Sequence, residues 1–294
     1  MKDEAISLAR GMTDPGQALN RLREYLQAFV LRSFHESEAF RSMAFVGGTA
    51  LRFLHGLPRF SEDLDFSLVA VDGYAGKKWM AKVKRDLALA GFIPDVTWND
   101  RKVVHTGWVR VAGILREAGL SAMPDQKLAI KVEIDTRPPA GAHCERRLVT
   151  RYMTFLLQHY TLPSLLAGKL HAAITRKHAK GRDWYDLMWY LSQRPPVAPN
   201  LLLLQNALDQ TQGDSRHNAQ SWRQLVRAQM ATLDMQAVCD DVAPFLERTQ
   251  DAFLLTRDNL EILLKNGNIQ VADAIHVVTD AKGRPLCRGG GKYP

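Results

Sequence analysis

The spacing of apolar residues mixes helical and strand-like patterns up to about residue 160 and is helical beyond it. Apolar residues at helical spacing predict helices over 17–32, 49–54 and 76–90. Short or alternating apolar runs predict strands over 44–46, 61–68, 102–106, 107–114, 127–135 and 146–158. After residue 162 the predicted helices cover 163–177, 182–193, 199–210, 218–231, 234–248 and 256–265.

This order of elements predicts an α/β domain over 1–160, followed by a helical domain over 161–266. The remaining tail, 267–294, has a possible small hairpin over 274–278 and a second run near Leu286. We assign no function to this tail.

The stretch AFVGGTALRFLHGLPRFSEDLDFSL, residues 44–68, joins three different patterns. A short buried strand over 44–46 meets Gly47-Gly48, and a helical pattern follows from Thr49. A strand that passes through two glycines into a helix presents unpaired backbone N–H groups, which commonly bind a phosphate.

The alternating run that follows places Asp63 and Asp65 on one face of the predicted strand, together with Ser61 and Ser67. Two neighbouring carboxylates repel each other unless a cation neutralises them, and hard oxygen ligands suit Mg²⁺. A D-x-D pair alone is more often a solvated strand face. Next to a phosphate-binding turn, however, it indicates a nucleotidyl-transfer site.

A third carboxylate is expected from the strand KLAIKVEID, residues 127–135. Its apolar face is formed by Ile130, Val132 and Ile134, so Lys131, Glu133 and Asp135 share the polar face. From the strand pattern alone, either Glu133 or Asp135 can serve. Alternatively, these three residues form only the ordinary polar face of an edge strand and have no role in a site.

Two helical segments carry further charged residues close to buried faces. Lys169 lies roughly 60° from the centre of the apolar stripe of its helix, so it either extends to solvent or pairs with an anion. Asp183 and Asp186 are three residues apart and project from one side of the next helix. Carboxylates in a first turn often serve only as caps or dipole partners.

The composition of the chain limits the kinds of partner that it can be expected to bind. The net charge is +8, and the basic residues gather in three clusters: Lys77, Lys78, Lys82, Lys84 and Arg85; Arg146, Arg147 and Arg151; Arg176, Lys177, Lys180 and Arg182. Such clusters are either solvated helix faces or contacts for RNA and nucleotide phosphates. No apolar run approaches the ~18 residues of a membrane span. Cys144, Cys239 and Cys287 match no zinc spacing. We expect a cytoplasmic protein without a membrane partner.

The string Gly47-Gly48-Thr49-Ala50-Leu51, followed by Arg59, Ser61 and Asp63-Leu64-Asp65-Phe66, resembles the nucleotidyltransferase superfamily. It is most similar to the AbiEii/MenT-type toxins of abortive-infection and toxin–antitoxin systems. The segments KVEIDTR, LLAGKL and RDWYDL resemble later motifs of that branch, in the same order, over residues 44–190. Asp135 departs from the Asn of many relatives.

The resemblance implies a polymerase-beta-like α/β nucleotidyltransferase domain with a mixed sheet, followed by an all-helical C-terminal domain. It implies NTP binding at the first motif and a metal, Mg²⁺ or Mn²⁺, at three carboxylates. By resemblance, Lys169 contacts a nucleotide phosphate, and Asp183 or Asp186 acts as a base or orients Lys169. The implied nucleotide-binding residues are Gly47, Gly48, Thr49, Arg59 and Ser61; the implied metal ligands are Asp63, Asp65 and Glu133.

The function implied is that of a toxin that transfers NMP from NTP to RNA, above all to the tRNA 3′ end, and so blocks translation. A cognate antitoxin protein or antitoxin kinase would counter it. Three roles are then open for Ser61. Its hydroxyl could contact a phosphate or the shell of the metal, or it could be the site that receives a transferred nucleotide or an antitoxin-dependent phosphate. In the third case it is an ordinary serine in a turn. The alternatives are nucleotidylation of a protein or small molecule, and a catalytically idle module that binds RNA or a partner. The sequence has no Walker A, H-E-x-x-H or G-x-S-x-G motif, which disfavours a hydrolase.

Overall fold

The structure, a computed structural model, describes residues 1–123, 125–213 and 216–265. The predicted hairpin over 274–278 and the run near Leu286 lie outside the described residues. The chain forms two compact units: one comprises Met1–Pro138 with Cys144–Tyr160, and the other comprises Pro139–His143 with the residues from Thr161 onward. A compact unit is not yet a domain that folds alone, so the domain limits 1–160, 161–266 and 267–294 stay a prediction.

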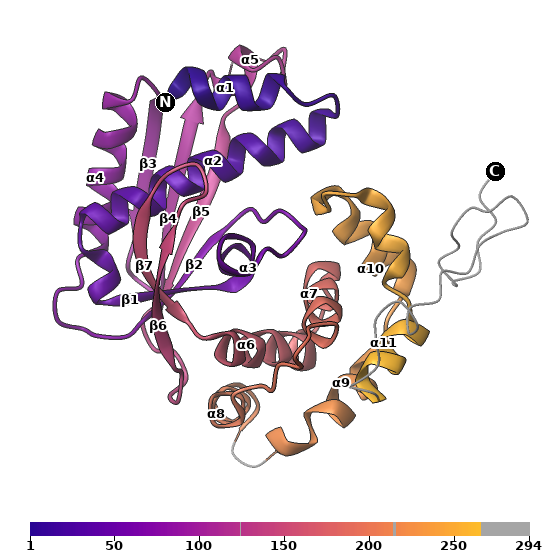
Figure 1. The fold of residues 1–294 in the computed structure, drawn as a ribbon. Helices are drawn as coiled ribbons and strands as arrows, with labels where there is room; N and C mark the ends of the chain where they lie inside the picture. Colours follow the sequence, from indigo (N-terminus) through magenta and orange to yellow (C-terminus); the bar gives the residue numbers. More distant parts are fainter. Residues whose placement is uncertain (124, 214–215, 266–294) are drawn as a thin grey trace, which may run out of the picture. The chain divides into compact units, whose positions relative to one another are not determined.

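A seven-stranded mixed sheet is the centre of the first unit, with the strand order β3-β4-β5-β2-β1-β7-β6 (Figure 1). The strands are β1 (Met43–Val46), β2 (Leu64–Leu68), β3 (Ile93–Asn99), β4 (Val104–Ala112), β5 (Leu128–Asp135), β6 (Cys144–Val149) and β7 (Phe155–Tyr160). β2 runs parallel to β5 and β1 runs parallel to β7, whereas the other neighbouring strands are antiparallel. β1 and β2 therefore lie in the middle of the sheet, where both edges are covered by other strands.

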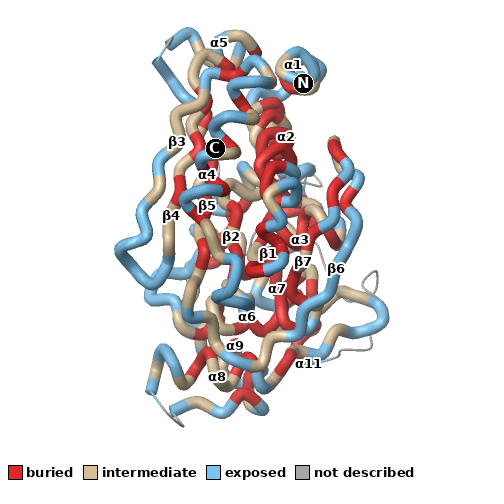
Figure 2. The backbone as a smooth tube through the Cα atoms, turned by 90° about the vertical axis from the view of Figure 1, so that its left-hand side faces the viewer, coloured by how far each residue is buried: buried red, intermediate tan, exposed pale blue. Residues whose placement is uncertain are grey.

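The helices of this unit are α1 (Lys2–Arg10), α2 (Pro15–Glu36), α3 (Gly47–His55), α4 (Gly76–Leu89) and the short α5 (Ile114–Glu117). The long helix α2 begins at a clear signal, because the Asp14 side chain caps the N–H of Gln17 at 2.7 Å and Pro15 occupies the first turn. α2 packs against β5 and β7, and α4 packs against β3. Figure 2 shows α2 buried along most of its length, whereas β6 is exposed.

Three strand predictions differ from the structure. β3 was not predicted, because its residues are exposed or half-buried and show no clean alternation. The runs 102–106 and 107–114 form the single strand β4, and the run 146–158 forms two strands, β6 and β7, which pair as a hairpin. Tyr152 takes a positive φ of 62° in the turn between them. These three differences fall toward the sheet edges, where partial burial leaves a weak pattern in a sequence.

A buried carboxylate ties α2 to the other elements of the first unit. Glu24, whose side chain is 2% exposed, contacts Arg52 Nε at 2.6 Å, Arg151 Nη1 at 2.9 Å and Tyr152 Oη at 2.6 Å. These partners come from α3 and from the turn between β6 and β7. Since a buried charge is tolerated only when it is paired, the network fixes α3 relative to α2 and the hairpin.

The half-buried His55 and the buried His159 both have lowered pKa values. The rings of His55 and His159 lie 6.0 Å apart. Burial, with a smaller contribution from His159 and Arg147, lowers the pKa of His55 to about 4, and burial also lowers the pKa of His159. Glu145 Oε1 lies 3.6 Å from His159 Nε2 and opposes that shift.

An unfolded histidine binds its proton near pH 6.5. The unfolded chain therefore holds more protons than the folded chain between about pH 6.5 and pH 4, so the free energy of unfolding should fall as the pH drops through this window. Above pH 6.5 His55 should have no effect. Melting temperatures of the wild type and His55→Phe between pH 7 and pH 4.5 test this. The variant should lose less stability than the wild type; an equal loss would contradict the assignment.

Within the described residues, the second unit consists of helices and loops. Its α-helices are α6 (Leu162–Thr175), α7 (Gly181–Leu191), α8 (Leu201–Gln212), α9 (Trp222–Ala231), α10 (Met235–Val242) and α11 (Arg257–Lys265). The helix predicted over 234–248 ends earlier, at Val242, and a short 3-10 helix over Ala243–Phe245 follows, since Pro244 has no N–H to continue the α-helical bonding. The mixed sheet and these helices confirm the predicted fold class. In the described part of the chain, no helix is long and apolar enough to cross a membrane.

Candidate active site

The two glycines at the start of α3 lie against charged side chains. Gly47 has a φ of +81°, and a Cβ there would lie 2.4 Å from Asp65 Oδ2. A Cβ on Gly48 would lie 2.4 Å from Arg59 Nη2. The sequence assigned these glycines to a phosphate-binding turn. The structure adds that they leave room for a carboxylate and a guanidinium at the helix N-terminus, where backbone N–H groups have no helical partner.

The loop before β2 is anchored through its backbone. The Thr49 hydroxyl donates a hydrogen bond to the carbonyl oxygen of Asp63, and Gln27 Nε2 donates to the carbonyl oxygen of Ser61 at 3.0 Å. β2 begins only at Leu64. The strand predicted over 61–68 is therefore wrong in its first three residues, because the carbonyls of Ser61 and Asp63 bond to side chains of α2 and α3. These bonds hold the Asp63 backbone in place next to the strand.

Strand pairing brings Glu133 beside Asp65. In the parallel pairing of β2 with β5, Asp65 is the register partner of Glu133, whereas Asp135 is the partner of Ser67. The Asp135 Oδ1 atom accepts a hydrogen bond from the backbone N–H of Arg137 at 2.9 Å. The register therefore favours Glu133 over Asp135 as the acidic neighbour of the D-x-D pair.

Lys131 is a charged member of this group that the sequence did not single out. Its Nζ atom lies 2.7 Å from Glu133 Oε1. Burial lowers the pKa of Lys131, but the hydrogen bond to Glu133 and the charges of Glu133, Asp63 and Asp65 outweigh burial and raise it. The ammonium group thus lies in the negative field of the three carboxylates. The signal was present in the sequence, because Lys131 and Glu133 are two residues apart on the same strand face.

These carboxylates fit a hard divalent cation in their chemistry, since oxygen ligands are those that Mg²⁺ and Mn²⁺ prefer. The arrangement of the three carboxylates in space fits such an ion only in part. Across the residues that the structure describes, no three Asp, Glu, His or Cys side chains converge as ligands of one ion. Glu133 is turned to Lys131. Asp63 and Asp65 are therefore the pair best suited to hold a metal, and Glu133 would join them only by leaving Lys131.

The second unit contains a separate charged cluster around Lys169 on α6. Lys169 Nζ lies 3.1 Å from Asp183 Oδ1 and 2.7 Å from Asp186 Oδ2, both on α7. Asp183 also pairs with Arg176 through its other oxygen. Asp186 is 0% exposed and Asp183 is 4% exposed. Of the two interpretations of Lys169, pairing with an anion is what the structure shows.

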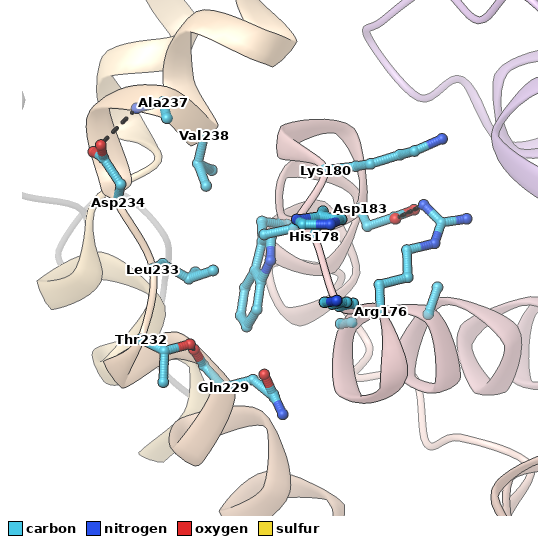
Figure 3. Close-up of a pocket in the computed structure, with 15 residues that line it drawn as sticks. Arg176, His178, Lys180, Asp183, Gln229, Thr232, Leu233, Asp234, Ala237 and Val238 are labelled. Carbon is cyan, nitrogen blue, oxygen red and sulfur yellow. Dashed lines mark hydrogen bonds and ion pairs between the residues drawn. The ribbon is translucent and has the colours of Figure 1, made fainter. Parts of the chain in front are cut away.

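Asp183 and Asp186 differ in what they face. Asp183 lines a pocket of about 330 Å³ between α7 and the segment that joins α9 to α10 (Figure 3). Asp186 is enclosed by the helices, with no exposed surface. Asp186 can therefore hold Lys169 but cannot reach a bound molecule, whereas Asp183 lies at the edge of a space that a ligand can enter.

The predicted site residues thus fall into two groups. The first unit brings together Gly47, Gly48, Arg59, Asp63, Asp65 and Glu133, with Thr49 and Ser61 in backbone-anchoring positions. The second unit brings together Lys169, Asp183 and Asp186. Sequence reasoning missed Lys131 in the first group, and in the second it did not assign Arg176 to Asp183.

Known proteins resemble this chain over most of its length. A family model described as the nucleotidyl transferase AbiEii toxin of type IV toxin–antitoxin systems matches residues 29–257, which is more than half of the chain. A crystal structure of a candidate nucleotidyltransferase from H. pylori is similar, with a TM-score of 0.50 at 18% identity, over 86% of this chain and 96% of that chain.

The Helicobacter pylori protein JHP933 gives a TM-score of 0.48 at 18% identity, over 85% of this chain and 92% of that chain. At such identity the likeness to the first structure shows the fold alone. No curated protein matches the chain.

Proposed function

Since the chain belongs to the AbiEii family, the nucleotidyl transferase toxins of type IV toxin–antitoxin systems, we propose that it transfers a nucleoside monophosphate from an NTP to RNA, with the 3′ end of a tRNA as acceptor. The observation that carries this proposal is the position of Asp65, which contacts Gly47 at the N-terminus of α3 and neighbours Glu133 across the sheet. Backbone N–H groups of a helix N-terminus and two carboxylate side chains thus lie close together in the first unit, which supports binding of phosphate and metal there.

The roles in the first unit follow from these contacts. The N–H groups of Gly47 and Gly48 and the Arg59 guanidinium would bind phosphate oxygens of the NTP. Asp63 and Asp65 would hold Mg²⁺ or Mn²⁺, which when bound offsets charge on the phosphates and on the departing pyrophosphate. Thr49 keeps the Asp63 backbone in place, and the absence of a side chain on Gly47 admits the Asp65 carboxylate. The proposed roles of the Ser61 hydroxyl stay predictions.

The roles in the second unit follow from charge and burial. Lys169 would contact a nucleotide phosphate, because its ammonium group is a compact positive charge whose N–H donors suit phosphate oxygens. Asp183 and Asp186, which lie 3.1 Å and 2.7 Å from that group, would hold it in position. Asp186 is then a positioning residue, since it has no exposed surface.

The basic residues support RNA as the acceptor. Arg146 and Arg147 are exposed on the edge strand β6, and Lys177 and Lys180 are exposed between α6 and α7. Contacts of lysine and arginine with the phosphate backbone supply most of the sequence-independent affinity for nucleic acids. We propose a cytoplasmic toxin whose cognate antitoxin, a protein or a kinase, counters it.

Radiolabelled NTPs test the proposed function. The purified protein is incubated with total RNA, Mg²⁺ and each labelled NTP in turn, beside an Asp65→Ala control. Label in a tRNA-sized band that the control lacks is the expected result, and it also identifies the preferred base. Label on protein would redirect the proposal to protein nucleotidylation. Bound NTP without transfer to RNA would leave a small-molecule acceptor or an idle module.

The third carboxylate can be identified by two amide variants. Glu133→Gln should lower the rate of transfer about 10²-fold, because it removes the charge beside Asp65. Asp135→Asn, two residues along the same strand face, should keep most of the activity, since Asp135 neighbours Ser67 and not Asp65. Initial rates at saturating NTP decide between them, and the reverse order of the two variants would show that Asp135 is the third carboxylate.

A further inference from the structure

The pocket beside Asp183 has two different walls (Figure 3). One wall is formed by Gln229 of α9, by Thr232 and Leu233 in the following link, and by Ala237 and Val238 of α10. The other wall is formed by Ala172 and Ala173 of α6, by the link over 176–180, and by Asp183 and Trp184 of α7. The two walls enclose about 330 Å³, at the lower end of the range of roughly 300–1,000 Å³ that is typical of small-ligand pockets. The space suits one small molecule or one unit of a polymer.

The residues that line this pocket carry more positive than negative charge. Lys177, His178 and Lys180 line it, and within the described chain their side chains take part in no hydrogen bond or ion pair. The two acidic residues of the lining are already engaged. Asp183 pairs with Lys169 and Arg176, and Asp234 caps α10 by accepting from the N–H groups of Gln236 and Ala237. A ligand of this pocket should therefore be an anion.

The α9–α10 wall calls for a flat, partly apolar group. Leu233 and Val238 of this wall supply apolar surface, and so does the buried Trp184 of α7, which also lines the pocket. The Gln229 side-chain amide offers donors and an acceptor, and the Thr232 hydroxyl, which donates to the Gln229 carbonyl oxygen at 2.8 Å, can still accept. Donors and acceptors of this kind read the edge of a nucleobase. Figure 3 shows the Arg176 and Lys180 side chains extending away from the α10 wall, on the side that carries Asp183. An anionic group of the ligand would lie on that side, next to the carboxylate that holds Lys169.

We propose that this pocket binds a single nucleotide, with its base against the α9–α10 wall and its phosphate at Lys177 and Lys180. The proposal rests on the function proposed above and adds a nucleotide subsite to the second unit. The nucleotide is either the terminal residue of the acceptor RNA or the free NTP. Both share the same chemistry, so the experiment must separate them.

Filling the pocket tests the proposal. Ala237 is exposed on α10 and lines the pocket, so Ala237→Trp should occupy the space without disturbing the core. Ala231→Trp is the matched control, because Ala231 is also exposed, at the end of α9, but does not line the pocket. Binding of a single-stranded RNA that is labelled at its 5′ end and has a free 3′ end is measured by fluorescence anisotropy, and binding of each NTP by equilibrium dialysis, with melting curves for all variants.

Ala237→Trp should raise the Kd for RNA or for NTP at least about tenfold, whereas Ala231→Trp should leave both unchanged. A larger effect on RNA identifies the acceptor nucleotide as the ligand, and a larger effect on NTP identifies the incoming nucleotide. Unchanged affinity for both overturns the proposal. Because the readout is binding, it stays interpretable even if the wild type transfers no label to RNA, which would instead refute the proposed function.

A charge variant keeps the test decisive should Ala237→Trp melt at a lower temperature. Lys177→Ser with Lys180→Ser should weaken binding of the same ligand and reduce the salt dependence of RNA binding, by about 0.7 in the slope for each phosphate that is no longer neutralised. Arg101→Ser with Lys102→Ser, in the exposed turn between β3 and β4, removes the same charge as a control. Equal behaviour of the two double variants would show that only net charge acts, and would overturn the pocket.

Discussion

Asp65→Asn should abolish nucleotidyl transfer, with the rate of label incorporation falling at least about 10³-fold. Asparagine has the shape of aspartate and can keep the close approach to Gly47, so the loop and the sheet should stay in place. What disappears is the negative charge at the point where the proposed metal binds. Single-turnover assays with saturating NTP measure the effect on the chemical step, and melting curves should show a change of only a few degrees.

Asp95→Asn is the matched control for this prediction. Asp95 lies on β3, is about half exposed and pairs with Lys127 at 3.2 Å. The same change of charge at this surface position should leave transfer intact, because an exposed ion pair contributes little. If Asp65→Asn kept more than about a tenth of the wild-type rate, the D-x-D pair would not be the centre of the reaction, and the site proposed in the first unit would be wrong.

Local sequence patterns point to the parts of the candidate site that residues close together in the chain form. Gly47-Gly48 and the D-x-D pair stand out because a turn and an alternating strand leave their signature within a few residues. The helical spacing around Lys169 likewise indicated a lysine too close to a buried face. Features of this kind can be located by residue number because each depends on a short stretch of chain.

Contacts between residues that are far apart in the chain could not be predicted from the sequence and are seen only in the structure. Whether Glu133 or Asp135 lies beside Asp65 depends on the register of β2 against β5, and a shift of two residues would exchange them. The charges of Asp63 and Asp65 that act on Lys131 likewise depend on the pairing of β2 with β5. The contact of Gly48 with Arg59 requires the loop after α3 to fold back on the helix N-terminus. No local pattern records such contacts.

Lys169→Met should destabilise the protein by about 3–5 kcal/mol and also lower transfer strongly. The substitution removes the ammonium group that neutralises two carboxylates, of which Asp186 is fully buried. A buried charge left without its partner is among the most destabilising changes in a protein interior. Urea unfolding of the full chain measures the loss. Lys265→Met, which breaks only an exposed pair with Glu261 at 3.5 Å, should change stability by less than about 1 kcal/mol.

A second substitution separates the two roles of Lys169. In Lys169→Met with Asp186→Asn the buried charge of Asp186 is gone, so much of the lost stability should return. Transfer should not return, because the ammonium group proposed to contact phosphate is still missing. Recovery of both stability and transfer would show that Lys169 serves only to neutralise Asp186. Recovery of stability alone places the lysine in contact with the nucleotide and leaves Asp186 as the residue that positions it.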